Sequence, residues 1–482
     1  MKVVLLFQIT LIAVSGLSMK KIFSTLCLKM TAAGLLFSLA LAGCVRDVTV
    51  VSSEGLPSEN TSSANSTPLP PEKQTMQGIV HLEGDGTFIL SDNEGNTLQF
   101  SLSAYQGDYT EIVQEGAEIQ VEYLEGDTPP CQLSGLKLVA PPPLWAEYRI
   151  QAEEILASLS LEEKVGQLFF IRCPSSNPAE QISAYHPGGI LMFGQDFEGL
   201  STEQVIGKID SYQQASSVPL LIGADEEGGT VVRVSSNPQL RQSRFPSPQQ
   251  LWNQGGMSAV IADAEEKSRL LLSLGVNVNL APVCDVSVMP GDFIYYRTLG
   301  QDAANTANYI DAVVGVMKKE GIGCVLKHFP GYGNNLDTHT GIAYDYRPME
   351  TFENSDFIPF QAGIQAGADC VLVSHNIVFA MDSANPASLS AEVHAILREK
   401  LGFQGVILTD DLSMDAVRFY IEGENAAVQA VAAGNDMLIV SDYSRQIPAV
   451  LQAVQDGRLE ESLIEKAAVR VLCWKLSLGL LG

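Results

Sequence analysis

Residues 323–339 read GCVLKHFPGYGNNLDTH, an apolar run followed by a loop that is rich in glycine and titratable side chains. The first four residues predict a buried strand, and the strand ends in Lys327 and His328. A proline and two glycines then interrupt regular structure, and Asp337 and His339 follow in the loop. Because catalytic side chains are often carried by loops on a rigid scaffold, we expect this stretch to form part of an active site.

Seven other short apolar runs alternate with helix-like stretches in the same part of the chain. Together with the first, the runs lie at 167–171, 188–193, 219–225, 276–282, 323–329, 370–375, 405–411 and 436–441. Strands that alternate with helices predict βαβ units and a parallel sheet. Eight units predict an α/β fold, a (β/α)8 TIM barrel over 144–482. An open doubly wound sheet is the alternative, disfavoured because no GxGxxG follows the first strand.

In such barrels the active site lies at the C-terminal ends of the strands. Polar residues follow the predicted strands at these ends, among them Asp225, Lys327, His328 and Asp410. A helix cap or a loop hydrogen bond would explain any one of them alone. Their convergence on one rim predicts a functional site.

The residue types on this rim favour acid–base chemistry. The chain has no GxSxG or HExxH motif and no His/Asp cluster with metal spacing, so we expect no metal and no cofactor. Hydrolysis of a glycoside with retention of the anomeric configuration needs an attacking carboxylate and a proton donor. Asp410 suits the first role and His339 the second, and Asp337 could orient the imidazole. Four further side chains would hold sugar hydroxyls: Asp225, Arg297, Lys327 and His328.

The amino-acid composition limits the kinds of partner and metal that the chain is expected to bind. The chain carries 29 Lys+Arg against 56 Asp+Glu, a net charge of −27, which argues against a nucleic-acid partner. Its eight cysteines form no CxxC pair, so a zinc site is not expected.

The first 43 residues contain four lysines and no acidic residue, and they end in an apolar region followed by LAGC at 41–44. This order resembles a bacterial lipoprotein signal peptide, 1–43, with lipidation at Cys44. A signal-anchor helix is the alternative, and translation could start at Met1 or Met19. Residues 44–75 have the composition of a disordered tether. We therefore expect an extracytoplasmic protein that is lipid-anchored to the bacterial cell membrane.

Residues 76–140 contain about five short β-like runs with a hairpin signal at Asp85-Gly86. They predict a small all-β module, a barrel or a sandwich, that precedes the TIM barrel. It contains no catalytic constellation, so a spacer or accessory role is favoured. Three prolines at 141–143 form a stiff boundary.

Several motifs resemble glycoside hydrolase family 3, and most closely its bacterial β-N-acetylglucosaminidases. They are KHFPGYG at 327–333, DTH at 337–339 and LTDDLSM at 408–414, with DEEGG at 225–229, NLAPVCDV at 279–286 and RTLG at 297–300. In motif order the resemblance covers about residues 150–480.

The resemblance implies a retaining, exo-acting β-N-acetylhexosaminidase that removes terminal N-acetylglucosamine from cell-wall fragments or related glycosides, which would give it a part in peptidoglycan turnover. The family's nucleophile falls on Asp410, its acid/base on His339, and the partner of that histidine on Asp337. Its sugar-binding positions fall on Asp225, Arg297, Lys327 and His328. The chain ends soon after the eighth strand, so we expect the proton donor to come from a barrel loop.

Two places in this loop depart from the family pattern: Tyr332 replaces the usual histidine of PGHG, and Asn334-Asn335 replace the usual Asp-Thr that follows. The dyad lies elsewhere, so we expect the chemistry to survive and Tyr332 to fill space beside the loop. The alternatives are a β-glucosidase or other exo-glycosidase, a phosphorylase on the same barrel, or a sugar-binding lipoprotein without catalysis.

Overall fold

The computed structural model describes residues 73–84, 86–110, 112–124, 128–338, 341–418, 420 and 426–481. The predicted signal peptide, Cys44 and nearly all of the predicted tether lie outside the described residues, and so does His339.

The N-terminal module is a closed five-stranded barrel with the strand order β1-β2-β3-β5-β4. Its strands are β1 (Lys73–Gly84), β2 (Thr87–Ser91), β3 (Thr97–Ser101), β4 (Glu118–Leu124) and β5 (Cys131–Ala140). Along β2, buried Phe88 and Leu90 alternate with half-buried residues, the period-2 pattern of a strand with one face on a core. The Phe88 and Phe100 rings stack at 5.5 Å inside this barrel.

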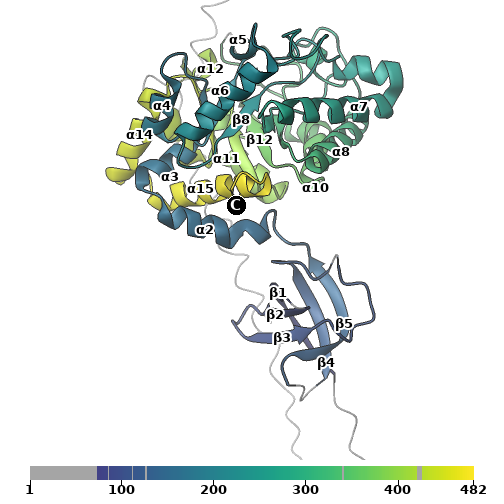
Figure 1. Cartoon of the computed structure of the whole chain (residues 1–482). Coiled ribbons are helices and arrows are strands. Elements are labelled where there is room, and N and C mark those ends of the chain that lie inside the picture. Colours follow the sequence, from purple (N-terminus) through teal and green to yellow (C-terminus); the bar gives the residue numbers. More distant parts are fainter. Residues whose placement is uncertain are drawn as a thin grey trace, which may run out of the picture. The chain divides into compact units, whose positions relative to one another are not determined.

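The larger part of the chain forms a parallel eight-stranded sheet with the order β14-β12-β10-β9-β8-β7-β6-β15. A parallel bridge from Leu408 to Met437 joins its two outer strands. The predicted α/β TIM barrel is thereby confirmed, and each strand lies in or overlaps one predicted run (Figure 1). The strands are β6 (Phe169–Arg172), β7 (Gly189–Met192), β8 (Leu221–Ala224), β9 (Val278–Asn279), β10 (Gly323–Phe329), β12 (Cys370–Val373), β14 (Val406–Thr409) and β15 (Leu438–Val440).

Helices cover the outside of this sheet, with α6, α7 and α8 prominent in Figure 1. They are α2 (Arg149–Ser158), α3 (Leu161–Gln167), α4 (Pro178–Tyr185), α5 (Gly194–Phe197), α6 (Thr202–Ala215), α7 (Pro248–Ser273), α8 (Ala303–Glu320), α9 (Met349–Thr351), α10 (Phe357–Gln365), α11 (Ala391–Ala395), α12 (Asp415–Arg418), α13 (Ala426–Ala433), α14 (Tyr443–Gln455) and α15 (Glu461–Ser477). Short turns of helix are η1 (Ala146–Tyr148), η2 (Tyr295–Arg297), η3 (Phe352–Asp356), η4 (Ala387–Leu389) and η5 (Ile396–Lys400). Ser201 and Ser247 form capping boxes that start α6 and α7.

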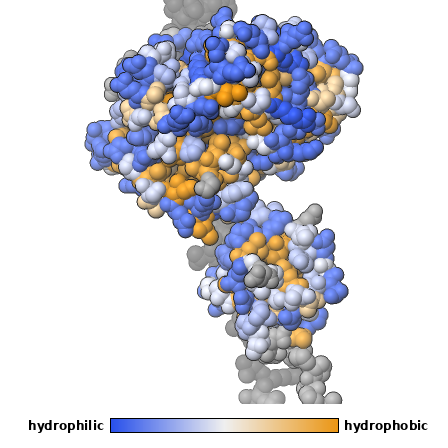
Figure 2. Space-filling model, viewed as in Figure 1, coloured by the Kyte–Doolittle hydropathy of each residue, from blue (hydrophilic) through white to orange (hydrophobic). Residues whose placement is uncertain are grey.

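Because helices cover the outer face and side chains fill the interior, the strands are apolar on both faces. Every residue of β7, β8, β12 and β14 is buried. Inside the barrel the Phe170 ring needs Gly189 and Gly223 beside it, because a Cβ at either position would lie 2.7 or 2.5 Å from the ring. Hydrophilic residues cover much of the face seen in Figure 2, as the acidic composition predicts. Among the described residues, no helix has the length and apolar character needed to cross a membrane.

Candidate active site

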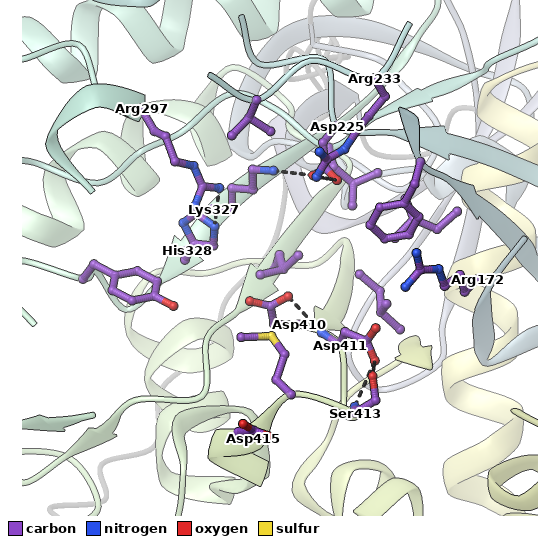
Figure 3. A pocket seen from close by; sticks show the side chains of 18 residues that line it. Arg172, Asp225, Arg233, Arg297, Lys327, His328, Asp410, Asp411, Ser413 and Asp415 are labelled. Carbon is purple, nitrogen blue, oxygen red and sulfur yellow. Dashed lines mark hydrogen bonds and ion pairs between the residues drawn. The ribbon is translucent and has the colours of Figure 1, made fainter. Parts of the chain in front are cut away.

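A cavity of about 510 Å³ opens at the C-terminal ends of the eight barrel strands (Figure 3). Its polar lining residues are Arg172, Asp225, Arg233, Arg297, Lys327, His328, Tyr332, Asp410, Asp411, Ser413 and Asp415. The structure thus brings together five of the predicted site residues, namely Asp225, Arg297, Lys327, His328 and Asp410.

The lining residues that lie at the strand ends themselves alternate between apolar and polar around the barrel. The apolar side chains Leu372, Leu280, Leu191 and Ile439 belong to, or directly follow, β12, β9, β7 and β15. The polar side chains Asp410, Lys327, Asp225 and Arg172 belong to, or directly follow, the other four strands, β14, β10, β8 and β6. Residues from alternate strands form the layers of a TIM barrel interior, so an apolar set and a charged set share the walls of this cavity.

One wall holds a buried network of charges. The Lys327 Nζ lies 2.8 Å from Asp225 Oδ1 and 2.7 Å from Glu227 Oε1. Arg297 binds Glu227 with two parallel hydrogen bonds of 2.8 and 3.0 Å, and Arg233 lies 3.2 Å from Asp225. Three cations therefore meet two carboxylates, and the network as a whole carries one positive charge.

These contacts decide the ionisation of the carboxylates. Burial alone would raise the pKa of Glu227, but the charges of Arg297 and Lys327 hold it well below its usual value. Burial would likewise raise the pKa of Asp225, and Lys327 and Arg233 reverse that effect so that its pKa is lowered. Both groups are ionised at neutral pH, and the network offers fixed donors and acceptors to a neutral polar ligand.

His328 orients Arg297 and is itself held by Asp285. Asp285 Oδ2 accepts a hydrogen bond from the His328 backbone N–H at 3.0 Å. The same oxygen lies 2.8 Å from Nδ1 of the His328 ring. Arg297 Nη2 lies 3.0 Å from His328 Nε2. Because a guanidinium can only donate, Nε2 must accept, and the imidazole proton lies on Nδ1 facing Asp285. In this arrangement both ring nitrogens of His328 are engaged, and the side chain positions Arg297.

The opposite wall carries two adjacent aspartates with different surroundings. The Asp411 carboxylate accepts from Ser413 N–H, Ser413 Oγ and Ser441 Oγ at 2.7–2.9 Å, so it braces the rim between β14 and β15. Asp410 Oδ1 accepts the Asp411 N–H at 2.8 Å. Figure 3 shows the Asp410 carboxylate on the side of the cavity nearer His328, and Asp411 turned toward Ser413.

The loop after β10 is fastened at several points. Tyr332 is 2% exposed, donates its N–H to Asp285 Oδ1 at 2.7 Å and places its hydroxyl 2.5 Å from Thr338 Oγ1. Its ring meets the His328 ring edge to face at 5.2 Å. Burial raises the pKa of Tyr332, and the charge of Asp410 adds to this effect. Tyr332 therefore does more than fill space, because it links the cavity wall to the residue next to Asp337.

Asp337 is half-buried in this loop, and it is not among the cavity-lining residues. His339 lies outside the described residues, so the predicted dyad stays a prediction. Glu227 and Asp285 hold charged side chains of the cavity wall, and the sequence pattern predicted no role for either. Both follow apolar runs, and this position could have predicted that they lie near the site. Their partners come from other strands, so only the folded structure identifies them. No group of His, Cys, Asp and Glu in the described residues is arranged to hold a metal.

A parallel (β/α)8 barrel with an aspartate at a strand end, facing a network of paired charges across an open cavity, is an arrangement that a barrel glycoside hydrolase can use. The model of the glycosyl hydrolase family 3 N-terminal domain matches residues 160–473. The chain belongs to glycosyl hydrolase family 3.

Named relatives agree with this assignment. The chain is similar to the β-hexosaminidase LpqI of Mycobacterium tuberculosis, with 31% identity over 339 residues, 67% of this chain and 84% of that protein. A solved family 3 β-N-acetylglucosaminidase from Paenibacillus sp. FPU-7 is 32% identical, with a TM-score of 0.63 over 67% of this chain and only 63% of that one. The β-N-acetylhexosaminidase of Beutenbergia cavernae is 29% identical, with a TM-score of 0.59 over 66% of this chain and 98% of that one.

Proposed function

We propose that this protein is a retaining, exo-acting β-N-acetylhexosaminidase that hydrolyses terminal N-acetylglucosamine from cell-wall fragments or related glycosides. The observation that carries the proposal is the position of Asp410 in a cavity lined by the charged network. The names of the relatives support the choice of sugar.

In the proposed mechanism Asp410 attacks the anomeric carbon and forms a glycosyl ester. As the glycosidic bond breaks, the leaving oxygen takes a proton from His339, which Asp337 orients. Water then attacks the ester, His339 accepts the proton of that water, and Asp410 is released. Asp225, Arg297 and Lys327 hold sugar hydroxyls during both steps, and His328 acts on the sugar through Arg297. Their mutual pairing keeps these side chains in place without reorganisation.

A panel of 4-nitrophenyl glycosides tests the choice of sugar. We expect release of 4-nitrophenol to be fastest from the N-acetyl-β-glucosaminide, with no dependence on inorganic phosphate. A higher kcat/KM on the β-glucoside would identify a β-glucosidase. Phosphate-dependent formation of a sugar 1-phosphate would identify a phosphorylase.

Replacement of His339 with alanine should chiefly slow substrates with poor leaving groups, because only these need the proton. We expect kcat/KM to fall by about 10²–10⁴-fold on an alkyl or sugar leaving group and by far less on 2,4-dinitrophenol. The measurement is kcat/KM against the pKa of the leaving phenol. Equal losses across the series would contradict the assignment of His339.

Tyr332 should support the same step through Thr338, which directly precedes the acid/base in the chain. In Tyr332→Phe the ring is kept and the 2.5 Å contact with Thr338 is lost. Since one hydrogen bond contributes about 1 kcal/mol and misplacement costs rate, we expect about a tenfold loss on poor leaving groups. Thr338→Val should have the same effect, and the double variant should be no worse than either single variant. Additive losses, or equal losses for good leaving groups, would refute this role.

We also propose that Cys44 is lipidated and anchors the protein outside the cell membrane, a proposal supported by LAGC at 41–44. In the bacterial host, Cys44→Ala should abolish incorporation of labelled fatty acid and move activity out of the membrane fraction. Continued labelling would contradict the anchor.

A further inference from the structure

Exposed aromatic side chains are concentrated on one side of the cavity. Every exposed aromatic side chain among the described residues lies in a segment that follows β9, β10 or β12. These three strands are neighbours in the sheet. The exposed aromatic residues are Phe293, Tyr296, Tyr344, Tyr346 and Phe379. Single exposed apolar residues scattered over a surface need no explanation, but a cluster beside an active site indicates a binding surface.

Three of these rings form what we call the aromatic platform: Tyr344, Tyr346 and Phe379. They stand on a small parallel sheet of β11 (Tyr344–Asp345) and β13 (Ile377–Val378). The ring centroids of Tyr346 and Phe379 are 4.6 Å apart, and Tyr344 lies 6.2 Å from Phe379 and 6.5 Å from Tyr346. Tyr344 is 48% exposed, Tyr346 72% and Phe379 43%. The three rings therefore leave much apolar surface in contact with solvent although they pack against one another.

The platform rests on a buried ionic foundation. Between the two tyrosines, Asp345 is 1% exposed and binds Arg347 through both carboxylate oxygens at 2.8–3.1 Å. Arg347 also binds both oxygens of Asp356 at 3.0 Å and donates to the Gly331 carbonyl at 3.0 Å. These bonds fix the backbone that carries the platform, and Arg347 is paired with two carboxylates.

The same foundation ties the platform to the cavity wall. The side-chain amide of Asn335 donates to Asp345 at 2.6 Å and to the Tyr332 carbonyl at 2.9 Å. Tyr332 lines the cavity. The platform thus lies beside the β10 side of the cavity. Two of its rings come from the chain segment that directly follows the loop containing Asp337 and His339.

We propose that the aromatic platform binds a pyranose ring of the leaving group, one or more sugars beyond the bond that is cleaved. This inference rests on the proposed function, in which the β10 loop supplies the proton to the leaving oxygen. The remainder of the substrate must therefore leave the cavity past this loop. The flat apolar faces of the aromatic rings match the apolar C–H face of a sugar. Because Arg347 is paired with two carboxylates, the surface offers no unbalanced positive charge and suits an uncharged ligand better than an anionic one.

The test compares substrates that do and do not reach the platform. Wild-type enzyme, Tyr346→Leu, Phe379→Leu and the double variant are assayed on 4-nitrophenyl N-acetyl-β-glucosaminide and on the β-1,4-linked tetramer of N-acetylglucosamine. Tyr346→Phe is the matched control, because it keeps the ring. We expect the ratio of kcat/KM for the tetramer to that for the aryl glycoside to fall about tenfold in the double variant, mainly through KM, and to be kept in Tyr346→Phe.

An unchanged ratio in the double variant, or an equal loss in Tyr346→Phe, would overturn the platform as a sugar site and leave another partner as its occupant. Binding separates this result from failure of the proposed function. Calorimetric titration of the Asp410→Ala protein with the tetramer, with and without the platform substitutions, measures the platform without turnover. A protein inactive on N-acetylglucosaminides whose tetramer binding still depends on Tyr346 would disprove the proposed activity and support the platform. Binding that is indifferent to Tyr346 and Phe379 would disprove the platform.

Discussion

Replacement of Asp410 with alanine should reduce kcat on 4-nitrophenyl N-acetyl-β-glucosaminide on the order of 10⁴-fold or more, because it removes the only group proposed to form the covalent intermediate. Fold stability should change little, since this side chain faces the cavity. The measurement is steady-state release of 4-nitrophenol, with thermal unfolding as the check on folding.

The neighbouring carboxylate supplies the control. Asp411→Asn perturbs the contacts with Ser413 and Ser441 and should cost far less activity than loss of Asp410. Azide can occupy the space left by a missing nucleophile, so it should restore turnover to Asp410→Ala and form a glycosyl azide. It should not do so for Asp411→Asn. Undiminished turnover in Asp410→Ala, or azide rescue only in Asp411→Asn, would assign the nucleophile elsewhere.

Glu227→Gln should destabilise the barrel by about 3–5 kcal/mol, because it leaves Lys327 and Arg297 buried without their shared counter-charge. The Glu227 side chain is only 1% exposed and that of Lys327 only 2%, so solvent compensates little for the lost carboxylate. Activity should also fall by about 10²-fold, since both cations lose the contact that aims them at the sugar. Urea denaturation measures the first effect and kcat/KM the second.

A surface pair tests whether burial causes this loss. Glu353→Gln breaks an ion pair with Lys400 in which the Glu353 and Lys400 side chains are 42% and 47% exposed. This substitution should lower the free energy of unfolding by less than about 1 kcal/mol. If both variants lost the same small amount, the buried network would not stabilise the fold in the way its geometry indicates.

The difference between wild type and Glu227→Gln should also depend on pH. The pKa of Glu227 in the folded protein lies below its ordinary value of 4.5, so its charge contributes stability above pH 4.5 and loses that contribution as the pH falls toward the folded pKa. We expect the full difference in unfolding free energy at pH 7 and a smaller one below about pH 4.5. A difference that stays constant down to pH 3 would point to lost packing rather than lost charge.

The barrel was predictable because its strands are buried on both faces and therefore read as continuous apolar runs. β10 and β14 show this most clearly, and the polar residues that end them, Lys327, His328 and Asp410, were predictable as rim residues for the same reason. The catalytic roles came from the resemblance to the family, since a strand end alone does not distinguish Asp410 from Asp411.

Pairings between strands were not predictable. Glu227 matters because β8 and β10 bring it to Lys327, and Asp285 because the segment after β9 lies beside His328. The division of polar and apolar lining between alternate strands depends on strand order and barrel shape, which no local pattern encodes. The two-residue strands β11 and β13 are too short to leave a period, so the aromatic platform had no signal in the sequence.

The most direct test of a retaining glycosidase with Asp410 as nucleophile is to trap the intermediate. The enzyme is incubated with a fluorinated N-acetylglucosaminyl fluoride, digested at low pH and analysed by mass spectrometry of its peptides. The mechanism predicts one glycosyl ester per chain, on the peptide containing Asp410, with activity lost in parallel. An adduct on another residue, or continued turnover without any adduct, would contradict it.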